Sequence, residues 1–215
     1  MTNSSLTAQE AVLQELRSAL AAGTLTPGQQ LIQEDLAEEL GVSRVPIRES
    51  LKILEGEGHV TYHPNRGYFV TELSATDLSE LYRIREILEA EALTRAVTEV
   101  SDADLKDIRE ILTKVNAAAA AGDIDELSRT NRQFHLSIIE LSGMNRLCRL
   151  IRQLWDASDI YRTVYFREET NRERIFSEHE EIFRALEARD AAALIRAQNQ
   201  HREQAVQVLT TVISR

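Results

Sequence analysis

All three prolines and six of the eight glycines in this 215-residue chain lie before residue 72. Both residue types interrupt helices, proline because it lacks an N–H and glycine because its backbone is too free. The rest of the chain therefore holds few residues that would stop a helix. This asymmetry predicts a first domain of short elements at residues 1–72, a linker at residues 73–78 and an all-helical domain at residues 79–215.

The second domain carries amphipathic patterns joined by short connections. We expect helices at about residues 77–98, 102–121, 123–142, 145–166, 171–188 and 190–212. Start signals precede several of them, including Ser101 with Asp104, Asp123 with Glu126, and Asp190. Short connections make consecutive helices antiparallel, so the sequence predicts an antiparallel helical bundle and a mainly α protein.

The first domain has the element order of a winged helix-turn-helix. Its patterns predict helices at residues 6–22 and 33–40 and after Ser43, and strands at residues 60–62 and 68–70 around the turn sequence HPNRG. Ser43 is the predicted N-cap of the third helix. Pro46 fits the first turn of this helix, where its missing N–H has no partner to lose.

The third helix concentrates cations in an otherwise acidic domain. Residues 1–72 contain ten Asp and Glu residues against five Lys and Arg residues, and three of those five lie in this helix. Arg44 and Arg48, at i and i+4, share one face at the N-terminal end of this helix. In a helix-turn-helix, that end of the recognition helix reaches base edges. They are predicted to contact guanine or phosphate. The structural alternative is a helix corner in which they pair with Glu49 or Glu55.

The stretch GTLTPGQQLIQEDLAEELGVSRVPIRESLKILEGEGHVTYHPNRGYFV, residues 23–70, closely resembles the DNA-binding domain of GntR-type bacterial transcription regulators. The DNA contacts that this resemblance implies are Ser43, Arg44 and Arg48 in the helix and Arg66 and Gly67 in the wing. Glu34 departs from the pattern, because some members carry a basic residue there. The implied partner is a palindromic double-stranded DNA operator bound by a homodimer.

Three of the five histidines, His135, His179 and His201, lie on apolar faces of the second domain. The expected turn at residues 189–190 lies midway between His179 and His201, so each is roughly 16 Å from it at about 1.5 Å per residue. They should face each other. Asn131 precedes His135 by one helical turn. Three imidazoles and an amide oxygen predict a divalent metal site with open positions, whereas the alternative is hydrogen-bonded core histidines.

Arg85 interrupts the apolar stripe of the segment LYRIREILEAEAL. A buried guanidinium needs an anion. This anion is either Glu89 at i+4 or the carboxylate of a bound effector. Both interpretations stay open at the level of the sequence.

From LYRIREILEAEAL onward, residues 77 to about 212 resemble the FCD ligand-binding domain of the FadR subgroup of these regulators. The metal ligands implied are Asn131, His135, His179 and His201. Many members carry Asp at the first position, and Asn131 keeps a carbonyl oxygen but drops a charge. The resemblance also implies dimerisation and a small organic acid next to the metal, with Arg85 as the candidate effector-binding residue. Zinc is the expected metal, with nickel and manganese as alternatives.

Composition narrows the classes of protein. A single cysteine, Cys148, forms no disulfide within the chain, and no run of about 18 apolar residues predicts a membrane span. The first residues, MTNSSLTAQE, lack the order of a signal peptide, so we expect a cytoplasmic protein. A net charge of -10 describes the average surface and leaves room for a local DNA-binding patch.

The leading interpretation is a metabolite-responsive transcription regulator without catalytic residues. One alternative is a metal-dependent enzyme built in the bundle, with an accessory DNA-binding module. The sequence near the histidines lacks an evident general base such as the glutamate of HExxH. A plain helical interaction protein would leave both the winged helix and the histidine set as coincidences.

Overall fold

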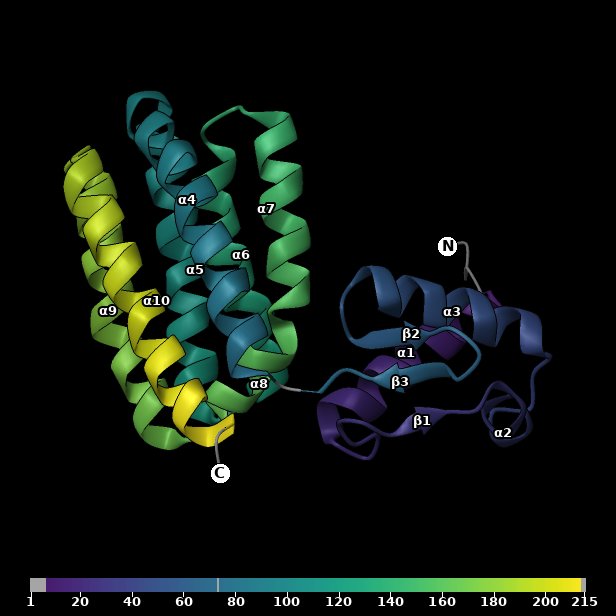
Figure 1. Ribbon diagram of the computed structural model, residues 1–215. Helices are drawn as coiled ribbons and strands as arrows, with labels where there is room; N and C mark the ends of the chain where they lie inside the picture. The colour runs from purple at the N-terminus through teal and green to yellow at the C-terminus, as the bar shows by residue number, and fades with distance from the viewer. Residues whose placement is uncertain (1–6, 73, 214–215) are drawn as a thin grey trace, which may run out of the picture. The chain divides into compact units, whose positions relative to one another are not determined.

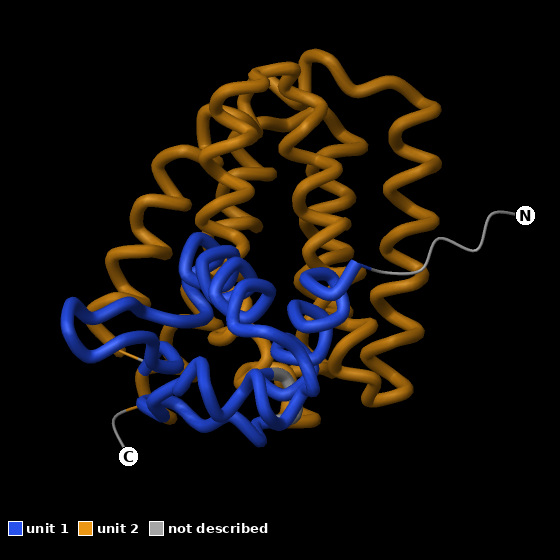
Figure 2. The backbone as a smooth tube through the Cα atoms, turned by 90° about the vertical axis from the view of Figure 1, so that its right-hand side faces the viewer, with its two compact units in different colours: residues 1–73 blue, residues 74–215 orange. Residues whose placement is uncertain are grey.

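The computed structural model describes residues 7–72 and 74–213. The chain divides into two compact units, residues 1–73 and residues 74–215 (Figure 2). In the described residues, a three-stranded sheet belongs to the first unit and the second unit is helical. The mainly α fold class predicted from the sequence is confirmed.

The first unit is a winged helix-turn-helix. Its elements are α1 (Ala8–Ala22), β1 (Gln30–Leu31), α2 (Gln33–Glu39), α3 (Arg44–Gly56), β2 (Val60–His63) and β3 (Gly67–Val70) (Figure 1). Strand β3 lies between β1 and β2 and is antiparallel to both, with Gln30 opposite Phe69 and Tyr62 opposite Tyr68. The sequence missed β1, because two residues are too few to show an alternating pattern.

Helix α1 begins after Thr7, which forms a capping box with Glu10. Leu6, where we expected this helix to begin, lies outside the described residues. The reciprocal bonds of the capping box satisfy two backbone groups that would otherwise lack a partner at the start of the helix. The local sequence thus defines the described start of α1.

One face of α3 anchors this helix in the core of the first unit. Ile47, Leu51 and Leu54 have no exposed surface, as their spacing predicts. They pack in one cluster with residues of α1, α2 and the sheet. Burying each such side chain contributes about 1.5–3 kcal/mol relative to exposure. The opposite face of α3 stays exposed and carries Arg44 and Arg48.

Ser43 is the N-cap residue of α3, as predicted, but its side chain makes no capping hydrogen bond. Its backbone has the extended conformation of an N-cap, with φ -75° and ψ 166°, yet no cap hydrogen bond reaches its hydroxyl. An N-cap side chain accepts from the second or third helical N–H. The third helical residue is Pro46, which has no N–H. The predicted side-chain cap is therefore wrong, and the helix does not engage this hydroxyl.

The second unit is a bundle of long helices. Its described elements are α4 (Ala75–Glu99), α5 (Asp102–Ala121), α6 (Ile124–Glu140), α7 (Asn145–Ala157), α8 (Asp159–Phe166), α9 (Glu169–Glu187) and α10 (Ala191–Ile213). The N-cap of α4 is Ser74, whose hydroxyl accepts from the N–H of Asp77. Residues 75–78, which we expected in the linker, are therefore the first turn of α4.

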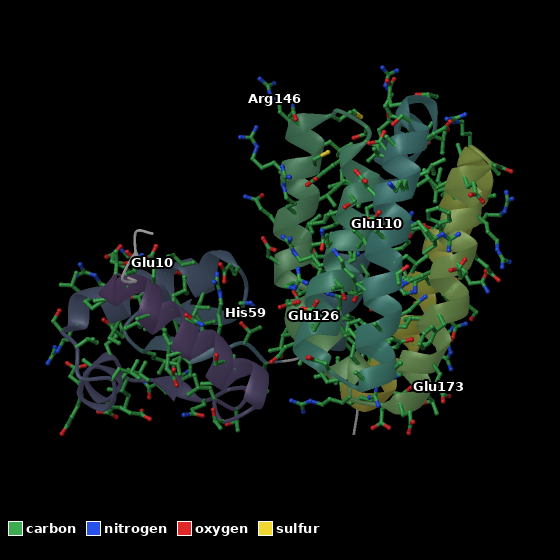
Figure 3. All side chains as sticks on the ribbon, turned by 180° about the vertical axis from the view of Figure 1, so that it is seen from behind. Glu10, His59, Glu110, Glu126, Arg146 and Glu173 are labelled. Carbon is green, nitrogen blue, oxygen red and sulfur yellow. The ribbon has the colours of Figure 1, made fainter. Side chains whose placement is uncertain are left out.

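Five helices of the bundle close into a ring. Contacts join α4 to α6, α6 to α5, α5 to α9, α9 to α10, and α10 back to α4. Helix α7 packs against α4 and α6, and α8 lies at one end of the bundle (Figure 1). Charged side chains such as Arg146 and Glu173 lie on the outside (Figure 3). The ring encloses the faces of α4, α6, α9 and α10 that carry the buried polar residues described below.

Residues 145–166, expected as one helix, form two helices that meet at Ser158. The carbonyl oxygen of Trp155 accepts from the Ser158 hydroxyl at 3.0 Å and from Arg162 Nη1 at 2.9 Å. In a continuous helix, that carbonyl would accept from the backbone N–H four residues later. Side chains compete for the acceptor and break the helix here. The expectation of one helix was wrong for this reason.

Candidate functional site

Arg44 and Arg48 lie in the first turns of α3 and pair with carboxylates. Arg44 Nη1 is 2.5 Å from Glu34 Oε1 in α2, and Arg48 Nε is 3.3 Å from Glu49 Oε1. Glu49 is one of the partners that the structural alternative named, whereas Glu34 was not expected. The four side chains are between 39% and 65% exposed. Such exposed pairs contribute about 0–1 kcal/mol, so they hold the two guanidinium groups only weakly.

The wing turns through two residues in the left-handed backbone region, Asn65 with φ 64° and Gly67 with φ 88°. Glycine adopts this conformation without strain. Between them, Arg66 holds its guanidinium 5.0 Å from the centroid of the Phe69 ring, and its carbonyl oxygen accepts from Gln30 Nε2 at 2.6 Å. Strand β1 therefore supports the wing tip, which presents an exposed cation.

Three histidines from three helices meet inside the bundle. His135 of α6, His179 of α9 and His201 of α10 bring ring nitrogens within 4.8 Å of one another. The rings of His179 and His201 are 4.9 Å apart, so the two residues face each other as their spacing predicts. The turn between α9 and α10 includes Arg189 in the left-handed region, with φ 53°. His135 and His179 are at most 1% exposed.

Hydrogen bonds orient two of the three rings. His135 Nδ1 lies 3.2 Å from Gln198 Oε1, and His201 Nδ1 lies 2.6 Å from Glu178 Oε2. Because both partners are acceptors, each Nδ1 carries a proton, and Nε2 is the nitrogen of each ring that could bind a metal. This is the arrangement of metal-ligating histidines, whose second nitrogen donates to a carboxylate or carbonyl oxygen.

The separation of two of the imidazoles suits a metal ion. His135 Nε2 and His179 Nε2 are 3.2 Å apart. Two ligands with bonds of about 2.1 Å to one metal lie about 3.0–3.4 Å apart in octahedral or tetrahedral geometry. Burial, together with the neighbouring histidines, lowers the pKa of His135 well below its ordinary value, and burial likewise lowers the pKa of His179. Both rings are therefore neutral at pH 7, as ligation requires.

Asn131 contributes a buried acceptor without a partner. It lies one turn before His135 on α6, and its Oδ1 makes no hydrogen bond within the described part of the chain. Leaving such an acceptor unsatisfied costs about 1–3 kcal/mol. A metal ion would satisfy it. The set of three imidazoles and one amide oxygen therefore fits a divalent cation, although the assignment of each ligand stays a prediction.

Next to the histidines, Glu89 of α4 accepts hydrogen bonds from several buried donors. It accepts from Arg85 Nε and Trp155 Nε1, each at 2.9 Å, and from Arg202 Nη2. Burial raises the pKa of Glu89, but the charges and hydrogen bonds of Arg85 and Arg202 outweigh burial and lower this pKa to about 2. Arg85 thus makes the i,i+4 pair, while its Nη1 donates to Ser158.

Two arginines of this network were not predicted. Arg202 lies in the apolar stripe of α10 between Leu194 and Leu209, which is the same signal that identified Arg85. Arg162 lies in α8 and is recognisable only in the fold, where the break at Ser158 turns it inward. Its guanidinium is 4.6 Å from the centroid of the Trp155 ring.

A cavity of about 30 Å³ opens beside these groups. It is bordered by Tyr82, Arg85, Asn131, Trp155, Arg162, Tyr165, Phe166, His201, Arg202 and Ala205. The Nε atoms of Arg162 and Arg202 are buried and have no hydrogen-bond partner among the described residues. Side chains from both the histidine cluster and the arginine network therefore reach one cavity.

Two family matches cover most of the chain. Residues 8–70 match the gntR family of bacterial regulatory proteins, and residues 80–204 match the FCD domain family. The chain belongs to the GntR family of transcription regulators. Within this family, it combines the winged helix-turn-helix with an FCD domain.

Relatives and solved structures agree with this assignment. The transcriptional regulator McbR of Escherichia coli is 38% identical over 155 residues, which is 72% of this chain and 69% of McbR. The YdhC regulator of Bacillus subtilis is 29% identical, covering 83% of this chain and 80% of YdhC. The solved structure of Escherichia coli McbR/YncC has a TM-score of 0.76 at 30% identity, covering 96% of this chain and 99% of that one. These relatives are named as regulators of transcription and not as enzymes.

None of the described helices in residues 7–72 and 74–213 has the length and hydropathy to cross a membrane.

Proposed function

We propose that this GntR regulator acts in the cytoplasm as a homodimer on a palindromic operator. In this proposal, its FCD domain senses a small organic acid beside a divalent metal ion. Two half-sites on DNA match two copies of a winged domain. Repression is the proposed mode, and relatives named as repressors support it, among them the gluconate operon repressor of Bacillus subtilis, at 27% identity over 88% of this chain and 80% of that protein.

The imbalance of buried charge carries the proposal of an acidic effector. Arg85, Arg162 and Arg202 are each at most 5% exposed, and Glu89 is the fully buried carboxylate among them. Asp159, partly exposed, balances Arg162 through a bond of 2.7 Å. One positive charge then remains without a carboxylate in the network. Because an uncompensated buried charge is costly, an anionic ligand would stabilise this site.

The size of the cavity limits the proposed effector to a small acid. On the same measure a water molecule needs about 10–15 Å³, so a cavity of about 30 Å³ holds about two waters. An acid of a few carbon atoms requires some movement of the lining side chains. The Nε–H groups of Arg162 and Arg202, which lack partners in the described part of the chain, provide donors for its carboxylate oxygens.

The proposed metal ligands are Asn131, His135, His179 and His201. A bound divalent ion would supply positive charge that attracts the acid and open positions that its oxygens could occupy. Zinc is the proposed metal, with nickel and manganese as alternatives. Trp155 lies between the two groups, with its ring 5.1 Å from that of His135 and 3.9 Å from the Arg85 guanidinium.

The test of effector sensing uses Trp155, which is the single tryptophan of the chain. A panel of small organic acids is added to the metal-loaded and chelator-treated protein, while thermal unfolding and tryptophan fluorescence are recorded. Stabilisation that requires both acid and metal is expected, since binding to the native state raises apparent stability. DNA affinity, measured by fluorescence anisotropy, should change with the same acid. If no acid affects either quantity, effector sensing by this site is wrong.

Replacing His179 with alanine should abolish stabilisation by the metal. The variant loses one of three imidazoles that meet in the cluster, and loss of a ligand weakens a metal site severely. The measurement is the shift in melting temperature on addition of zinc to the chelator-treated protein. The matched control is His63→Ala, an exposed histidine at the end of β2. An unchanged zinc-dependent shift in the His179 variant would contradict the metal site.

Replacing Glu34 with lysine should strengthen DNA binding and steepen its salt dependence. The change removes the carboxylate paired with Arg44 and adds a cation in the first turn of α2. One additional phosphate contact makes the slope of log K against log salt more negative by about 0.9. Anisotropy titrations at several salt concentrations measure this slope. Glu15→Lys, on the exposed face of α1, controls for the change in net charge alone.

A further inference from the structure

Glu178 is a largely covered carboxylate that the DNA and effector proposals do not use. It immediately precedes His179 on α9, but its Oε2 accepts from His201 Nδ1 on α10 at 2.6 Å. The two side chains are 11% and 13% exposed. The bond therefore crosses from one helix of the ring to the next at the level of the histidine cluster.

The three histidines differ in the partner of their second nitrogen. His135 has the neutral amide of Gln198, and His179 Nδ1 has no partner within the described part of the chain. Among the described residues, Glu178 is the carboxylate hydrogen-bonded to the cluster. A carboxylate in this position fixes the tautomer and raises the basicity of the ligating nitrogen.

The charge of the ligand set makes the hydrogen bond between Glu178 and His201 important. Three neutral imidazoles and the amide of Asn131 leave the full charge of a divalent ion uncompensated by its ligands. The nearby Arg85 adds to that positive charge, since its guanidinium lies 3.9 Å from the centroid of the Trp155 ring, which is itself 5.1 Å from the His135 ring. A negative charge one hydrogen bond beyond the ligands would offset part of the repulsion between the metal ion and Arg85.

We propose that Glu178 is a positioning residue of the metal centre. It holds His201 with Nε2 facing the metal and supplies the negative charge that Asn131 lacks. This inference rests on the proposed metal site. The competing explanation is that Glu178 merely joins α9 to α10 through a hydrogen bond.

Glu178→Gln separates these explanations, because glutamine keeps a hydrogen-bond acceptor but removes the charge. Zinc affinity of the chelator-treated protein is measured in competition with a chromophoric chelator. We expect affinity to fall about 10- to 100-fold in this variant. The matched control is Glu181→Gln, an exposed carboxylate on the same helix, which should leave affinity within about twofold because its charge is screened by solvent.

A second experiment restores a carboxylate within the ligand set. Asn131→Asp combined with Glu178→Gln should recover most of the lost affinity, because charge returns to the site by another route. A purely structural bond between α9 and α10 would not be rescued from α6. The urea midpoint of each metal-free variant, followed by Trp155 fluorescence, reports whether the unit folds.

Gln198→Glu leaves Glu178 in place and keeps the proposal testable if Glu178→Gln does not fold. It puts a carboxylate on His135 Nδ1 and should tighten zinc binding by the same mechanism. Equal zinc affinity of the Glu178→Gln variant and the unsubstituted protein, or no gain from Gln198→Glu, overturns the role of Glu178. Absence of zinc binding by the unsubstituted protein instead overturns the metal centre itself.

Discussion

Replacing Arg44 or Arg48 with alanine should weaken operator binding by about 5- to 150-fold, which corresponds to about 1–3 kcal/mol for an arginine that pairs with guanine. Both side chains project from the first turns of α3, where a recognition helix meets base edges. In the free protein their carboxylate partners are exposed and hold them weakly. The arginines should therefore transfer to DNA with little loss.

The measurement is fluorescence anisotropy on a duplex selected from random DNA by the unsubstituted protein. Loss of a base contact relaxes specificity at particular positions of the operator. Loss of a phosphate contact weakens binding to all sequences and makes the dependence of log K on log salt less steep by about 1. The matched control is Arg17→Ala, an exposed cation on α1 that pairs with Glu57 just beyond α3. If Arg44→Ala and Arg48→Ala bind as tightly as Arg17→Ala, α3 is not the recognition helix.

Replacing Glu89 with glutamine should destabilise the second unit by about 3–5 kcal/mol, because removing one partner of a buried ion pair leaves the other charge uncompensated. Here two guanidinium groups, Arg85 and Arg202, lose their shared anion inside the ring. Urea unfolding followed by tryptophan fluorescence measures this effect in the second unit alone, since Trp155 is the single tryptophan. A loss below about 1 kcal/mol would be expected only of an exposed pair and would contradict the network.

The same carboxylate predicts a dependence of stability on pH. The pKa of Glu89 is lowered from 4.5 to about 2 in the folded protein. The ionised form is therefore favoured by folding, and its contribution is full above pH 4.5. It is lost as pH falls from 4.5 towards 2, by about 3 kcal/mol in total. The difference between the unsubstituted protein and Glu89→Gln should shrink over that range.

Glu86→Gln is the matched control for Glu89. Glu86 lies on the same helix and pairs with Arg83 at 2.6 Å, but the Arg83 side chain is 65% exposed. Its removal should change stability by less than about 1 kcal/mol at neutral pH. Comparable losses in the two variants would mean that the effect arises from α4 as a helix and not from the buried network.

The long helices were predictable because their signals are local. Ser101, Asp123 and Asp190 each precede a helix and accept a hydrogen bond from it, as the start signals indicated. The break at Ser158 was not predictable. It arises because the side chains of Ser158 and Arg162 donate to the carbonyl oxygen of Trp155, and their orientation depends on the surrounding bundle. The lost cap of Ser43 was readable in principle, since Pro46 has no N–H.

By itself, the sequence determined the order of elements apart from β1 and the break at Ser158. It also determined the winged helix-turn-helix and the facing of His179 and His201, because these follow from helical periodicity and chain length. Only the tertiary structure decided which charges share the interior. Arg85 joins Glu89 as an i,i+4 pair, but Arg202 and Trp155 reach the same carboxylate from positions remote in sequence. Helix packing sets such pairings, because a buried charge accepts whichever partner the fold brings within hydrogen-bond distance.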